Sequence, residues 1–62
     1  MNYELRGDLN PLEVIVVTDD LQKRGVERAT LRPGNECIWV SHGRCECYYI
    51  FREGKLIGVQ YD

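Results

Sequence analysis

Three short turn signals divide the second half of the chain into segments of strand length. Pro33-Gly34, His42-Gly43 and Glu53-Gly54 each contain a glycine, and only short segments separate them. Glycine accepts the positive φ that tight turns require, and proline presets φ at the second turn position. Consecutive segments joined in this way pair as antiparallel strands, because a parallel crossover needs a much longer connection. The sequence therefore predicts a three-stranded C-terminal meander, with strands at 36–41, 44–52 and 55–61.

The first half of the chain is less regular. Residues 12–18 are rich in β-branched side chains and follow Asn10-Pro11, a boundary at which strands often begin. The continuous apolar character of this segment predicts a strand that is covered on both faces. A further strand is expected at 26–32, with Ala29 and Leu31 on one face. A short strand at 3–6 is another candidate.

A break in the β pattern lies between these two segments. Thr18 is a suitable N-cap, acidic residues follow it, and Gly25 is suitable for the residue after a helix end. We expect one short helical turn at about 19–24, too short to connect parallel strands.

These elements predict one small domain over residues 1–62, which is the size of an SH3-like or OB-like fold. The expected fold class is all-β and mainly antiparallel: a small barrel or bent sheet of about five strands. A domain of 62 residues has a thin stability margin, and we therefore expect the protein to be a homodimer.

Two-residue turns set the strand pairing of the meander, and the pairing predicts an aromatic face. The expected pairs are Val40 with Cys45 and Tyr49 with Gly58. One face then carries no charged residue and is the natural core. The other carries a set of residues typical of protein interfaces: Trp39, Tyr48 and Tyr61, with Arg44 and Glu46 toward one end. We predict that this face binds a partner; the alternative is that it forms the other half of a closed barrel.

The charge balance disfavours nucleic acid as the main partner. Ten acidic residues against eight basic ones give a formal charge of −2, whereas affinity for phosphate backbones comes from basic residues. One local basic stripe remains, formed by Lys23, Arg24, Arg28 and Arg32. It supports an alternative hypothesis in which a small β-barrel binds single-stranded nucleic acid.

Four potential metal ligands lie close together in the sequence: Cys37, His42, Cys45 and Cys47. Cysteine and histidine are the ligands that zinc prefers, so a small zinc-binding domain is a second alternative. Their spacing matches no common zinc module, and two of the cysteines are expected in the core as small apolar residues. We therefore predict no metal or other cofactor. We also predict no catalytic activity, since the single histidine lies at a turn without an orienting partner.

The remaining features concern compartment and role. The first residues contain no basic and apolar segments of a signal peptide, and no apolar run is long enough to span a membrane. An odd number of cysteines suits a reducing cytoplasm better than a disulfide-bonded secreted domain. The sequence thus predicts a small cytoplasmic interaction or regulatory module, of the kind carried by phages or mobile elements.

Overall fold

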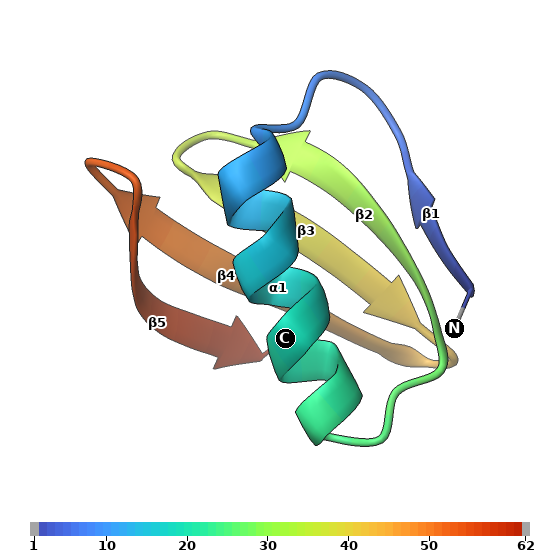
Figure 1. Cartoon of the computed structure of the whole chain (residues 1–62). Helices are drawn as coiled ribbons and strands as arrows, with labels where there is room; N and C mark the ends of the chain where they lie inside the picture. The colour runs from blue at the N-terminus through green and yellow to red at the C-terminus, as the bar shows by residue number, and fades with distance from the viewer. Residues whose placement is uncertain (1, 62) are drawn as a thin grey trace.

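The computed structural model describes residues 2–61 as five strands and one helix (Figure 1). In chain order these are β1 (Asn2–Leu5), α1 (Pro11–Lys23), β2 (Arg28–Gly34), β3 (Cys37–His42), β4 (Cys45–Arg52) and β5 (Lys55–Tyr61). The prediction of a mainly antiparallel β protein of about five strands is confirmed, and so is the C-terminal meander. The single helix within this part of the chain is not long and apolar enough to cross a membrane.

The strands form one sheet in their chain order, from β1 at one edge to β5 at the other. β1 pairs with β2 in parallel, and the other three pairings are antiparallel. β1 and β5 are both edges, so the sheet is open; of the two expected forms, a barrel or a bent sheet, the barrel is wrong.

The segment expected as a strand at 12–18 is instead the first half of α1. Asn10 is the N-cap: its side chain accepts a hydrogen bond from the backbone N–H of Leu12 at 2.9 Å. Pro11 occupies the first helical turn, where its missing N–H costs nothing. These start signals, together with burial of Val17 and Leu21 against the sheet, outweigh the strand propensity of the β-branched run.

Helix α1 continues through the region expected as an isolated turn at 19–24. Thr18 lies inside the helix, where its hydroxyl donates to the carbonyl of Val14 at 2.9 Å. After the C-cap Arg24, Gly25 has a φ of +77°, and the N–H groups of Gly25 and Val26 close back onto the last turn. The predicted role of Gly25 is therefore confirmed. The full helix is long enough to connect the parallel strands β1 and β2, which the shorter expected turn was not.

The core lies between α1 and one face of the sheet. The buried residues alternate along β2, β3 and β4, as expected for a strand with one covered face. They are Val17, Leu21, Ala29, Leu31, Ile38, Val40, Cys47, Tyr49 and Phe51. We call this the helix side of the sheet. No other helix or strand of residues 2–61 covers the opposite side, which we call the open face.

The turns between strands differ from prediction in two places. The first loop is Asn35 and Glu36, two residues later than the expected turn, so Pro33 and Gly34 belong to β2. The second loop is Gly43 and Arg44, and His42 pairs with Cys45. This shifts the pairing of β3 and β4 by two residues from the expected one. A shift of two preserves which residues share a face, so the predicted faces of both strands are correct.

A bulge changes the pairing of β4 and β5. Phe51 pairs with Leu56, which fits the predicted turn at Glu53-Gly54, but Ile50 pairs with Gly58 and Tyr49 with Val59. Ile57 is therefore an extra residue on β5. Because of this insertion, each residue of β5 after Ile57 lies on the opposite side of the sheet from the side predicted for it. The expected pair of Tyr49 with Gly58 is wrong for this reason.

Candidate functional site

The open face carries a group of polar and aromatic side chains that α1 leaves uncovered. Strand pairing and the burial pattern place on it the side chains that alternate with the core residues. They are Asn2 and Glu4 on β1; Arg28, Thr30 and Arg32 on β2; Cys37, Trp39 and Ser41 on β3; Glu46, Tyr48 and Ile50 on β4; and Gln60 on β5. This is the only extended sheet surface of residues 2–61 that has no covering element.

A row of three interacting side chains runs across the middle of this face. Arg32, Trp39 and Tyr48 are direct cross-strand neighbours on β2, β3 and β4. The rings of Trp39 and Tyr48 lie 4.6 Å apart between centroids and are tilted by 38°. The guanidinium carbon of Arg32 lies 5.9 Å from the centre of the Trp39 ring. We call these three residues the aromatic row. Its contacts hold the indole in one orientation while 37% of Trp39 stays exposed.

Gly34 supplies the space that the indole occupies. A Cβ atom at this position would lie 2.4 Å from both Cδ1 and Nε1 of Trp39, and 2.6 Å from the Sγ of Cys37. These distances are far below van der Waals contact, so only glycine allows the ring to lie against β2. The sequence predicts only a turn at Gly34 and does not indicate this role, because nothing in the chain order shows which ring approaches it.

Charged and polar side chains surround the aromatic row. Glu46 is exposed on β4, two residues before Tyr48, and Arg28 is exposed on β2. Arg44 is exposed in the loop between β3 and β4. A shallow hollow beside the row is lined in part by Arg28, Thr30 and Ser41. An aromatic centre with a polar, arginine-containing rim is the usual composition of a protein interface.

Tyr61 does not belong to this surface, although the predicted face included it. The bulge at Ile57 turns Tyr61 to the helix side, where it pairs with Cys47 and the guanidinium of Arg24 lies 5.5 Å from its ring centre. The structure therefore brings together Trp39, Tyr48 and Glu46, leaves Arg44 at the end of the hairpin, and separates Tyr61 from them.

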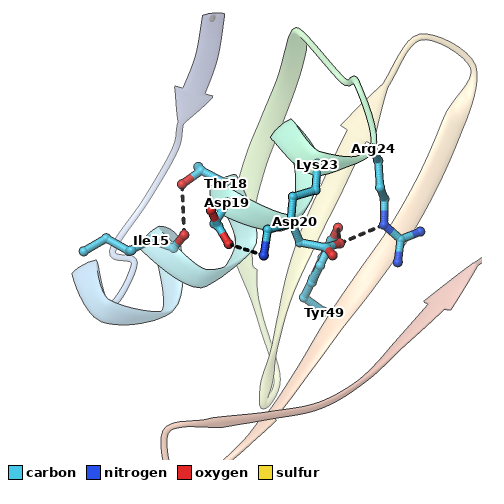
Figure 2. A network of polar contacts seen from close by, with 7 residues as sticks. All are labelled: Ile15, Thr18, Asp19, Asp20, Lys23, Arg24 and Tyr49. Carbon is cyan, nitrogen blue, oxygen red and sulfur yellow. Dashed lines mark hydrogen bonds and ion pairs between the residues drawn. The ribbon is translucent and has the colours of Figure 1, made fainter.

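On the helix side of the sheet, a polar contact joins α1 to β4 (Figure 2). The Tyr49 hydroxyl donates to Oδ2 of Asp20 at 2.5 Å, and Nε of Arg24 donates to the same oxygen at 2.8 Å. Tyr49 is 1% exposed, and burial, the hydrogen bond and the charge of Asp20 all raise its pKa above the ordinary value of 10.0. Burial likewise raises the pKa of the Cys47 thiol. This cluster fixes the helix on the sheet.

The predicted basic stripe is divided between the two sides of the sheet. Lys23 forms an ion pair with Asp19 at 3.2 Å, and Arg24 is held by Asp20, both on α1. Only Arg28 and Arg32 lie on the open face. The four cations therefore do not form one continuous track for a phosphate backbone.

The possible metal ligands are also separated. Cys37 lies on the open face, Cys47 is buried on the helix side, and Cys45 is exposed at the start of β4 opposite His42. Within residues 2–61, no group of three or more histidine, cysteine or acidic side chains is placed to hold a metal ion. The structure does not form the alternative zinc site.

Comparisons with protein-family models, curated proteins and solved structures found no match for this chain.

Proposed function

We propose that the protein is a small non-enzymatic interaction module that binds a partner protein through the open face of its sheet. The observation that carries this proposal is the aromatic row, in which Arg32 and Tyr48 both lie against Trp39 and Trp39 stays accessible. Tryptophan, tyrosine and arginine are the residues that most often dominate binding energy at protein interfaces. Holding them in place before binding reduces the entropy lost on association. We place this activity in the cytoplasm, as a regulator or inhibitor of the bound protein.

Replacement of Trp39 by alanine tests the proposal. The side chain is on the uncovered face and makes no contact with α1, so Trp39→Ala is expected to leave the fold intact. Loss of a central interface tryptophan typically costs about 2 kcal/mol or more of binding free energy, which is roughly a thirtyfold weaker Kd. The measurement is capture of the partner from the source lysate, followed by calorimetry with the purified partner.

Leu5→Ala is the matched control, because Leu5 is an exposed apolar residue on the helix side of β1. It is expected to bind as the wild type does. Equal capture by wild type and a folded Trp39→Ala variant would contradict the proposal. Circular dichroism and thermal melting of both variants establish that they are folded.

One observation favours a second function, binding of single-stranded nucleic acid. Arg28 and Arg32 share the open face with Trp39 and Tyr48, and such proteins combine basic residues with aromatic rings on which bases stack. In the aromatic row, however, Arg32 and Tyr48 already lie against the indole ring, so they compete with a base for stacking on it. The overall negative charge also opposes binding.

A titration with labelled single-stranded DNA and RNA separates the two functions. Nucleic-acid binding predicts a complex that weakens steeply with salt and is lost in an Arg28→Ala, Arg32→Ala double variant. Our primary proposal predicts no such complex.

A further inference from the structure

A second surface, distinct from the open face, gathers most of the exposed large apolar side chains. Among residues 2–61 there are eight such side chains, and six of them lie on α1 or β5. They are Leu12, Ile15, Val16, Leu56, Ile57 and Tyr61. Scattered exposed apolar residues are ordinary, whereas a concentration on two neighbouring elements indicates an interaction surface.

The helical repeat shows which way the α1 residues of this group face. Leu12 and Val16 lie eight and four residues before Asp20, so they share one flank of the helix with it. On that flank Asp20 binds Tyr49 of β4, and Arg24 lies over Tyr61 of β5. The flank carrying Leu12 and Val16 is therefore the one turned toward the β5 edge of the sheet.

β5 itself is an unpaired edge. It pairs with β4 on one side and with nothing on the other among the described residues. Its residues Gly58–Tyr61 pair regularly with β4 beyond the bulge, so their outer backbone groups form a regular edge. Such an edge binds another strand. The only charged residue of β5 is Lys55, at its start.

From these observations we infer that the β5 edge and the adjoining flank of α1 form the dimer interface of this protein, with β5 of a second copy as its occupant. Two-fold symmetry pairs β5 antiparallel with its own copy, so the same residues complete the surface on both sides. The two Lys55 side chains then lie at opposite ends and do not repel. The apolar side chains of both α1 flanks and both β5 strands form one layer over the joined sheet.

The exposed area is near the lower limit for a specific dimer. Ile15 lies five residues before Asp20, on the other flank of α1, so five of the six side chains adjoin the β5 edge. At roughly 150 Å² for each large side chain, the exposed parts of these five amount to roughly 400 Å². Both copies together contribute roughly 800 Å², and the paired backbone edges add to this, toward the lower limit of about 1,200 Å² for specific complexes.

This arrangement places both helices on one side of the joined sheet and both open faces on the other. The two aromatic rows are then available at once, so the dimer is bivalent for any partner of that face. The inference does not depend on the proposed function, because the interface does not include Trp39.

The test is the dimer dissociation constant, measured by analytical ultracentrifugation on the full chain. Ile57→Lys and Val16→Lys each introduce a charge into the interface, and each is expected to weaken the dimer about tenfold or more. Both positions are exposed in the protomer, at 57% and 40%, so the folded protomer tolerates them. Leu5→Lys is the matched control, since Leu5 is 52% exposed at the other edge of the sheet.

The inference predicts a wild-type dimer that both interface variants weaken and that Leu5→Lys and Trp39→Ala leave unchanged. A wild-type protein that stays at 7.2 kDa over the whole concentration range would overturn it. A dimer that Trp39→Ala dissociates and Ile57→Lys does not would also overturn it, and would assign the contact to the open face. Partner capture by the same variants is measured in a separate experiment. A failure of the proposed function can therefore be distinguished from a failure of the dimer inference.

Discussion

At the scale of single residues, the open face depends on the absence of one side chain. Trp39 lies against β2 because Gly34 has no Cβ there. From that position the indole contacts Arg32 and Tyr48 across the sheet. The orientation of the ring, and with it the shape offered to a partner, is thus determined by a glycine on the neighbouring strand.

Gly34→Ala is expected to displace the indole and to destabilise the fold by about 1–3 kcal/mol, as overpacking usually does. Its Trp39 fluorescence should differ from that of the wild type. Gly58→Ala is the matched control, because Gly58 is also a strand glycine and a Cβ there would meet no atom within 4 Å. Denaturant unfolding, followed by Trp39 fluorescence, measures the free energy of unfolding of both variants. A Gly34→Ala protein with wild-type stability and fluorescence would refute this placement of the ring.

At the scale of elements, the decisive contact is the one that joins α1 to β4. Tyr49 is buried beneath the helix, and its hydroxyl donates to Asp20, which Arg24 also binds (Figure 2). The phenol is neutral in this contact. Because its pKa is higher in the folded protein than in the unfolded chain, deprotonation favours unfolding.

The stability that Tyr49 contributes is therefore complete below its unfolded pKa, near 10.0, and is lost as the pH rises above that value. Burial also raises the pKa of the Cys47 thiol above its ordinary value of 9.0. Deprotonation of this thiol therefore also destabilises the fold as the pH rises above 9.0. Tyr49→Phe should cost about 1 kcal/mol at neutral pH, through the lost hydrogen bond, and should reduce the alkaline loss of stability. Tyr61→Phe, on the same side but 57% exposed, is the control. Melting curves from pH 7 to 11 that show identical alkaline loss in Tyr49→Phe and wild type would contradict this account.

The faces of β3 and β4 could be predicted from the sequence, whereas the bulge in β5 and the start of α1 could not. The alternation of β3 and β4 correctly placed Trp39 and Tyr48 on one face, since a pairing shift of two residues preserves the faces. The bulge at Ile57 leaves no mark in the chain order, and Tyr61 was misplaced for that reason. The segment 12–18 was misread because its β-branched residues outweighed Asn10-Pro11, which is a helix start as well as a strand boundary.

At the scale of the whole molecule, one helix covers one side of a five-stranded sheet and leaves two surfaces available (Figure 1). The open face presents the aromatic row, and the β5 edge presents an unpaired strand beside an apolar helix flank. A chain of 62 residues buries only about 60% of the surface that its unfolded form exposes. Association through β5 would add buried area while leaving the open face available.

Acrylamide quenching of tryptophan fluorescence measures directly whether the open face is available for a partner. Trp39 is the only tryptophan of the chain, so its emission reports on this face alone. We predict a readily quenched indole, consistent with its 37% exposure, with the same quenching constant at every protein concentration. A shielded indole, or quenching that falls as the protein is concentrated, would show that the face is covered and would contradict the account.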